Sequence, residues 1–168
     1  MKQRIHRIAG CVFLASAVLC AGRVGNWWSP YSSESYNWYM SLVKPCWSNE
    51  VNLLLAGGLA IHIAMAAIAC VLLLRKGWAT TAAVIGPQLV LSLVWSNLFF
   101  VNRSIGLALI AMMGIAFLAI WTIRLLPRQR WVLRVIVGLY IIGIIVYCVT
   151  NGTIWVMNAG VDVYRMPY

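Results

Sequence analysis

The sequence predicts an all-α fold: a polytopic membrane protein built as a bundle of five transmembrane helices. Of its 168 residues, 63% are hydrophobic and only 10% are charged, which is more apolar surface than a soluble domain of this length can bury. The apolar residues also fall into runs of about 20, the length that a helix needs to cross the hydrocarbon core of a bilayer. Because five such runs take up nearly the whole chain, we expect one domain over residues 1–168.

The first span is expected at residues 8–24, behind a basic leader. A charged leader before an apolar run is also typical of a signal peptide, and Ala15-Ser16-Ala17 resembles a cleavage site. The apolar run continues past that site to Ala21, which favours a retained helix. Both interpretations stay open at this point.

A long polar connection follows at residues 25–50 and is rich in Trp, Tyr and Ser. The remaining spans are expected at residues 51–74, 79–101, 105–126 and 131–157. Short polar or proline-containing breaks separate them, at Arg75-Lys76, Asn102-Arg103 and Pro127. The first loop is therefore the one long connection in the chain.

Lysine and arginine predict the orientation, because cytoplasmic connections carry an excess of positive charge. With the N-terminus in the cytoplasm, nine positive residues lie inside and four outside, and all three acidic residues lie outside. We therefore expect a multi-pass protein of the cell membrane whose first loop and C-terminus are outside. The net charge of +10 then reflects topology and predicts no nucleic-acid partner. The inner residues are Lys2, Arg4, Arg7, Arg75, Lys76, Arg124, Arg128, Arg130 and Arg134, and the outer ones are Arg23, Lys44, Arg103 and Arg165.

The first loop gathers four tryptophans, Trp27, Trp28, Trp38 and Trp47, together with three tyrosines. Aromatic side chains with one polar atom suit two roles in such a place. They can cap the outer mouth of the bundle and line a pocket for a flat apolar ligand, or they can lie on the lipid headgroups. The residues alone leave both roles open.

The third span carries a polar stripe. Gln88, Ser92 and Trp95, followed by Ser96 and Phe99, recur at spacings of three and four residues and so share one face of a helix. Polar side chains in a span face protein or a cavity rather than lipid. The stripe predicts either hydrogen bonds between helices or the wall of a ligand cavity.

His62 lies about halfway along the second span, and Asn151 lies in the fifth. Three interpretations of His62 stay open: a proton-sensitive group, a haem ligand, or a core residue with a hydrogen-bond partner. Haem ligation by two histidines is excluded, because His6 lies far away in the leader. Asn151 predicts a helix contact or a pocket group.

Small residues give the second span a smooth face, formed by Ala56, Gly57, Gly58, Ala60 and Ala64. Such a face allows two helix backbones to approach closely in lipid. The contact can be internal to the bundle or can join two chains as a homodimer, and the sequence does not separate these.

The sequence carries no enzyme signature. The expected spans contain no Asp or Glu, and there is no Ser/His/Asp set, phosphate loop or metal-ligand spacing. The five cysteines form no CxxC motif and are interpreted mostly as small buried residues, with a Cys20–Cys46 disulfide left open. We therefore expect no catalytic residue, no metal and no required cofactor.

Three blocks of the sequence carry a family resemblance. Residues 38–47 read WYMSLVKPCW, and residues 88–100 read QLVLSLVWSNLFF. In the fifth span Tyr140, Asn151, Trp155 and Asn158 recur at the expected spacing. Together these blocks resemble the TspO/MBR family, the tryptophan-rich sensory proteins related to the mitochondrial translocator protein (peripheral benzodiazepine receptor).

The resemblance implies a five-helix bundle, often a homodimer, with a cavity under the first loop. The family binds porphyrins, haem-type molecules or other flat hydrophobic ligands and has a sensory or transport-related role. Carried over by position, the resemblance implies a lid of Trp38, Tyr39, Pro45 and Trp47. The other expected ligand-binding residues are His62, Gln88, Ser92, Trp95, Tyr140 and Asn151.

Several positions depart from the family pattern. Ser92 stands where the family usually has Asn, and His62 lies near a tyrosine position in a second span that is here aliphatic and glycine-rich. Gly152 and Val156 replace the tyrosine and arginine of a cholesterol-recognition pattern, so cholesterol binding is not carried over. The alternatives to a receptor are a small transporter or channel for hydrophobic solutes and a structural membrane subunit.

Overall fold

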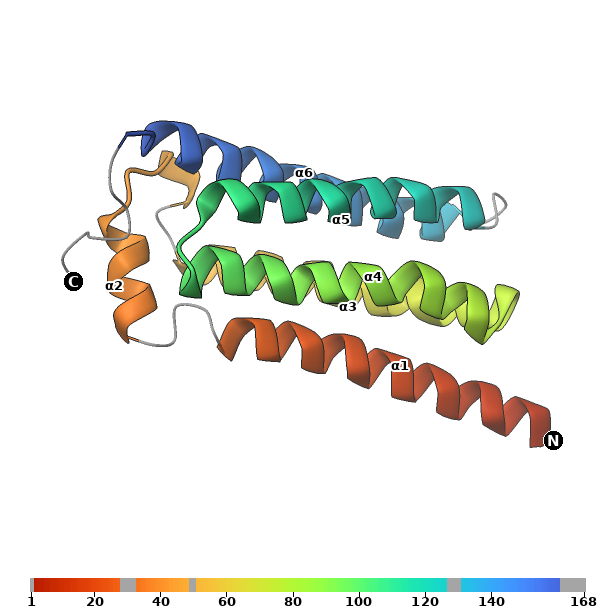
Figure 1. Ribbon diagram of the computed structural model, residues 1–168. Helices are drawn as coiled ribbons and strands as arrows, with labels where there is room; N and C mark the ends of the chain where they lie inside the picture. The colour runs from red at the N-terminus through yellow and green to blue at the C-terminus, as the bar shows by residue number, and fades with distance from the viewer. Residues whose placement is uncertain (1, 28–32, 49–50, 127–130, 161–168) are drawn as a thin grey trace.

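The computed structural model is a bundle of long helices that lie side by side, with a short helix across one end (Figure 1). It describes residues 2–27, 33–48, 51–126 and 131–160. All regular elements within these ranges are helical, so the predicted all-α fold is confirmed. In chain order they are α1 (Lys2–Trp27), α2 (Ser33–Ser41), the 3-10 turn η1 (Cys46–Ser48), α3 (Val51–Lys76), α4 (Trp78–Ser96), the π-helical turn η2 (Asn97–Val101), α5 (Ile105–Leu125) and α6 (Trp131–Met157).

Within the described residues, four helical stretches are long and apolar enough to cross a membrane. They are Ala56–Lys76, Trp78–Val101, Ile105–Leu125 and Trp131–Met157. The fifth long helix, α1, has a shorter described apolar stretch at His6–Ala21. Many large apolar side chains point away from the bundle, such as Ile110 and Phe117, each about two-thirds exposed. A surface of this kind is stable against lipid, and the chain is a multi-pass membrane protein.

The first loop is more ordered than the polar connection expected at residues 25–50. Helix α1 continues to Trp27, and α2 and η1 lie within the loop. Lys44 caps the C-terminal end of α2. Its Nζ donates hydrogen bonds to the carbonyl oxygens of Tyr39 and Met40, at 2.7 and 3.1 Å. A cation at the last carbonyls of a helix satisfies them and opposes the negative end of the helix dipole. The residues Trp28, Tyr31 and Glu50 of the expected loop lie outside the described residues.

Close approaches at glycine fix the arrangement of the long helices. Helices α3, α4, α5 and α6 form a ring of neighbours, and α1 packs against α3 and α4. A methyl group at Gly10 of α1 would lie 3.0 Å from Leu73 of α3, and one at Gly143 of α6 would lie 2.9 Å from Ile61 of α3. Small residues matter here because close packing, rather than the hydrophobic effect, holds helices together in lipid.

A buried hydrogen-bond network joins three of these helices. The Tyr140 hydroxyl of α6 donates to Oε1 of Gln88 in α4 at 2.5 Å. Nε2 of Gln88 donates to Oγ1 of Thr122 in α5 at 3.1 Å and to the Val84 carbonyl at 2.9 Å. Gln88 is fully buried, and its amide oxygen and nitrogen are both engaged. The expected ligand-binding residue Gln88 therefore serves helix packing in this structure.

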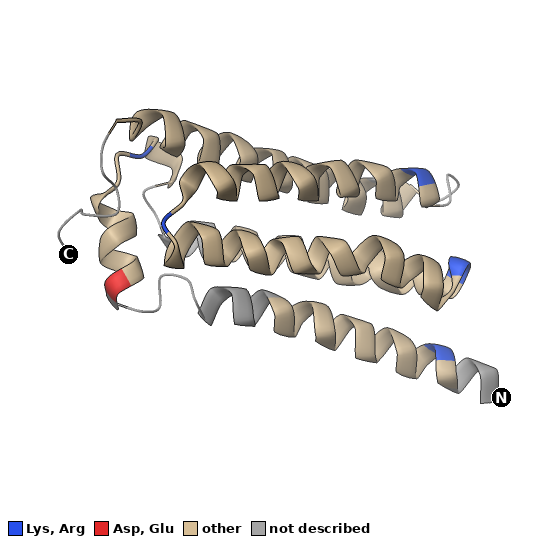
Figure 2. Ribbon diagram, in the orientation of Figure 1, with Lys and Arg blue, Asp and Glu red and all other residues tan. Residues whose placement is uncertain are grey.

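The described charges lie at the two ends of the bundle (Figure 2). One end holds Arg7 near the start of α1, Arg75 and Lys76 in the last turn of α3, and Arg124 in the last turn of α5. The end that α2 covers holds Glu34, its ion-pair partner Arg103, and Lys44 just after α2. These are the groupings that the topology of the sequence assigns to opposite sides. The remaining charged residues of that assignment, among them Arg128, Arg130, Arg165 and Asp162, lie outside the described side chains.

We predict that Tyr140→Phe lowers the free energy of unfolding by about 1 kcal/mol, because it leaves Oε1 of Gln88 buried without its donor. Thermal unfolding of the purified protein in detergent measures the change. The matched control is Tyr36→Phe, at an exposed tyrosine of α2. Equal melting temperatures for Tyr140→Phe and the wild type would contradict a structural role for the network.

Candidate functional site

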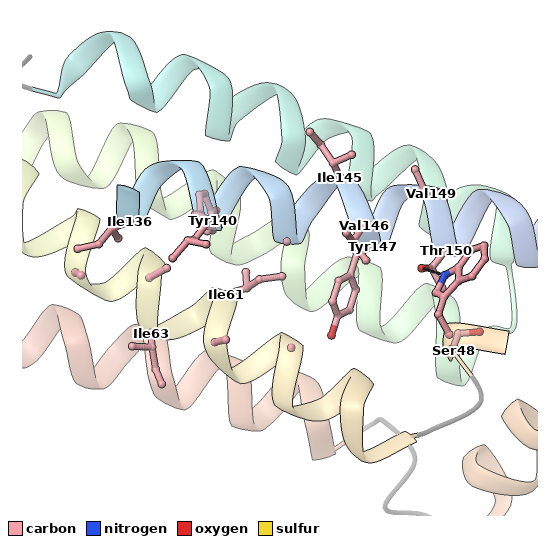
Figure 3. Close-up of a pocket in the computed structure, with 17 residues that line it drawn as sticks. Ser48, Ile61, Ile63, Ile136, Tyr140, Ile145, Val146, Tyr147, Val149 and Thr150 are labelled. Atoms are coloured by element: carbon pink, nitrogen blue, oxygen red, sulfur yellow. Dashed lines mark hydrogen bonds between the residues drawn. The ribbon is translucent and has the colours of Figure 1, made fainter. Parts of the chain in front are cut away.

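A pocket of about 960 Å³ lies between α3 and α6 (Figure 3). Its walls are mostly apolar, and several wall residues, such as Ile63 and Leu139, are more than half exposed on the outside of the bundle. The pocket therefore opens sideways between two helices. Its lining is Trp47, Ser48, Gly57, Ala60, Ile61, Ile63, Ala64, Ala67, Ile136, Leu139, Tyr140, Gly143, Ile145, Val146, Tyr147, Val149 and Thr150.

The helices on the two sides of this pocket touch at small residues, and this contact positions Tyr147. The Tyr147 side chain extends from α6 toward α3 (Figure 3), where its hydroxyl packs against Gly57 and Gly58. A methyl group at Gly57 would lie 3.2 Å from the Tyr147 oxygen. Glycine at 57 and 58 therefore leaves room for the phenol, and the ring forms part of the pocket wall.

Trp47 closes the end of the pocket nearest the first loop. It lies in η1, and its Nε1 donates to Oγ1 of Thr150 in α6 at 3.2 Å. More than half of its surface is exposed. An indole with a satisfied N–H and a free face is suited to stacking on a flat ring.

Two other aromatic residues of the first loop, Trp38 and Tyr39, are buried. Trp38 and Tyr39 of α2 are each 1% exposed and pack against Phe99 and Phe100 of η2, with the Trp38 and Phe99 ring centroids 5.5 Å apart. The Tyr39 hydroxyl donates to the Ser48 carbonyl at 2.7 Å. Burial raises the pKa of the Tyr39 phenol, so it remains a neutral donor. These contacts make α2 and η1 one unit, which we call the lid (residues 33–48).

Two polar contacts, a pair of hydrogen bonds and an ion pair, hold the lid against the bundle. Asn158, directly after α6, accepts a hydrogen bond from the Val43 amide at 3.1 Å and donates to the Val43 carbonyl at 2.9 Å. Arg103, between η2 and α5, forms an ion pair with Glu34 at 2.7 Å, and its guanidinium lies 5.9 Å from the Trp38 ring centroid. Arg103 has a positive φ of 53°. Its place at this sharp turn brings the guanidinium to α2.

His62 and Ser92 form a pair inside the bundle. Nδ1 of His62 lies 2.8 Å from the Gly58 carbonyl oxygen, which only accepts, so in the neutral ring Nδ1 carries the proton. Nε2 then accepts from the Ser92 hydroxyl at 3.3 Å. Of the interpretations open for His62, the structure matches the core residue with hydrogen-bond partners. Neither residue lines the pocket.

Trp95 and Asn151 differ from the other polar residues of the interior. Among the described residues, the buried polar side-chain atoms without a hydrogen-bond partner are Nε1 of Trp95 and both amide atoms of Asn151. Asn151 is 3% exposed. The Trp95 ring lies edge-on to Tyr147, with centroids 6.0 Å apart, and Asn151 lies one turn beyond Tyr147 on α6. These unpartnered groups therefore lie behind the lid end of the pocket.

The residues predicted to form one ligand site therefore lie in different parts of the structure. Trp47 and Tyr140 line the pocket, whereas Trp38, Tyr39 and Pro45 are buried in the lid. Sequence reasoning missed Tyr147, Thr150 and the aliphatic residues of α6. The sequence did contain one indication that Tyr147 belongs with Tyr140: the two residues are two helical turns apart, which places both on one face of α6.

No group of three or more His, Cys, Asp or Glu that could hold a metal ion is found in the described part of the chain. In a comparison with protein families, the TspO/MBR family model matches residues 13–156 of this chain. A comparison with curated proteins gave no match. The family match spans α1 to α6 and so includes the lid, the pocket and the buried network.

We predict that Asn158→Ala loosens the lid, because it removes both hydrogen bonds to Val43. Amide hydrogen exchange in residues 33–48 should become about tenfold faster, the effect of losing roughly 1.4 kcal/mol of local stability. Mass spectrometry of exchanged peptides measures this. The control is Thr153→Ala, whose hydroxyl bonds within α6 to Val149. Unchanged amide exchange in the lid of Asn158→Ala would show that the Asn158–Val43 hydrogen bonds do not stabilise the lid.

Proposed function

The chain belongs to the TspO/MBR family, and on this basis we propose that it is a membrane receptor for a flat hydrophobic ligand of the porphyrin or tetrapyrrole class, bound between α3 and α6. The observation that carries the proposal is the apolar pocket of about 960 Å³. Ligand pockets in proteins typically have volumes of about 300–1,000 Å³ and a mostly apolar lining. The family match supports a hydrophobic ligand, and the pocket supplies the space for it.

The shape of the lining favours a flat ligand. On the α3 side the wall is formed by small residues, including Gly57, Ala60 and Ala64, which leave a smooth surface for a ring system. On the lid side Trp47 offers an exposed indole. Ser48 and Thr150 are polar groups at the same end. We therefore place the polar edge of the ligand toward the lid and its apolar body between the helices.

Trp95 and Asn151 add a reason for this placement. An unpartnered polar atom in an apolar interior costs free energy, and a ligand that supplies a partner regains it. Both residues lie next to Tyr147, which forms part of the pocket wall. Rotation of Tyr147 on ligand binding would bring polar substituents of the ligand to these atoms and would break the Tyr147 contact with Gly58. Movement of the lid is then the proposed signal.

The proposal involves binding and no covalent chemistry. It requires no axial ligand to a haem iron, because both ring nitrogens of His62 have protein partners and His62 does not line the pocket. It likewise assigns no catalytic residue. A homodimer, expected from the resemblance, is part of the proposal, and the mass of the detergent-solubilised protein tests it: a mass of two chains supports the dimer.

We predict that Ala60→Phe weakens protoporphyrin binding at least tenfold, because the new ring occupies the pocket. Trp47→Ala should weaken it about fivefold, the effect of losing a stacking contact worth about 1 kcal/mol. Titration followed by porphyrin absorbance measures both. The controls are Ala82→Phe on the exposed side of α4 and Trp131→Ala at the far end of α6. If both pocket variants bind as tightly as the wild type, the proposed site is wrong.

The orientation is also proposed from charge: the lid end faces outward and the end with Arg75 and Lys76 faces the cytoplasm. Cys46, an exposed thiol in the lid, is a natural probe of this orientation. A membrane-impermeant maleimide should label intact cells that express the wild type, and Cys46→Ser should lose that label. Labelling of Cys46 only after the membrane is permeabilised would reverse the proposed orientation.

A further inference from the structure

Two cysteines on neighbouring helices lie against each other, far from the lid. Sγ of Cys70 in α3 lies 3.5 Å from the carbonyl oxygen of Cys11 in α1. Sγ of Cys11 lies 3.9 Å from the carbonyl oxygen of Cys70. Each sulfur therefore reaches the backbone of the opposite residue.

The packing of α1 on α3 explains this closeness. Gly10, the residue before Cys11, lies so close to α3 that a methyl group there would be 3.0 Å from Leu73. All five cysteines are free thiols, including Cys20 and Cys46, the pair for which a disulfide was left open. Cys11 and Cys70 are each half-buried rather than fully enclosed.

We propose that Cys11 and Cys70 are a dithiol site that a hydroperoxide oxidises to a disulfide between α1 and α3. One thiol, as its thiolate, attacks the peroxide oxygen, forming a sulfenic acid as the O–O bond breaks; with hydrogen peroxide the leaving oxygen becomes water. The second thiol attacks that sulfur, the S–S bond forms, and the hydroxyl leaves as a second water. The two sulfurs lose two electrons in total, and the peroxide gains them.

The position of Cys70 gives this bond a structural consequence. Ala67, one turn before Cys70 on α3, lines the pocket between α3 and α6. A covalent link to α1 fixes this part of α3 and restricts its movement relative to α6. The proposal does not depend on the identity of the ligand or on the proposed function of the pocket, since it concerns thiols that do not line it.

Peptide mapping of the oxidised protein tests the proposal. The purified protein in lipid nanodiscs is treated with hydrogen peroxide, its remaining thiols are blocked with a maleimide, and the digest is analysed by mass spectrometry without reduction. We expect the thiol content to fall by two per chain, with a Cys11–Cys70 cross-linked peptide that disappears on reduction. Cys11→Ser and Cys70→Ser should each abolish this peptide.

The matched control is Cys148→Ser, because Cys148 is also half-buried but lies on α6. It should form the Cys11–Cys70 peptide as the wild type does. Cross-links between other cysteines, links between two chains, sulfinic acids without a disulfide, or no loss of thiols would each overturn the proposal. Intrinsic tryptophan fluorescence and elution volume confirm that the serine variants are folded before they are compared.

Discussion

Because the interior of a bilayer offers no water to a buried amide, the partners of Gln88 determine how three helices pack. Its side chain accepts from Tyr140 of α6 and donates to Thr122 of α5, while its own helix supplies the Val84 carbonyl. Shifting any of these helices by one turn would leave a buried polar group without a partner. The network thereby fixes α4, α5 and α6, and the position of α6 decides where a gap remains beside α3.

The pocket follows from this fixed position of α6. Helices α3 and α6 approach closely where Tyr147 contacts the glycines at 57 and 58 and where Gly143 faces Ile61. Between and beside these contacts the small residues of α3 fail to fill the space, and the pocket results. Trp95 and Asn151 lie next to it with unpartnered polar atoms. Buried groups that break the rule of hydrogen-bond satisfaction are expected where a protein binds something.

The sequence predicts the membrane bundle well, because length and hydropathy largely determine which segments cross a bilayer. It predicts the lid poorly, because α2 is stabilised by contacts from elsewhere in the chain, such as Phe99 and Phe100. For the site, the spacing of Gln88, Ser92 and Trp95 shows a shared face but does not show which helix covers it. The small residues of α3 predicted a packing face, and only the placement of α6 shows that Ala60 and Ala64 line a pocket.

We propose that the space between α3 and α6 binds a flat hydrophobic ligand under the lid. A structure of the full chain in lipid, determined with saturating protoporphyrin, tests it most directly. We expect ring-shaped density between α3 and α6, against the Trp47 indole, with the Tyr147 side chain moved away from Gly58. Density elsewhere in the bundle, or an empty pocket while the porphyrin is bound at another surface, would contradict it.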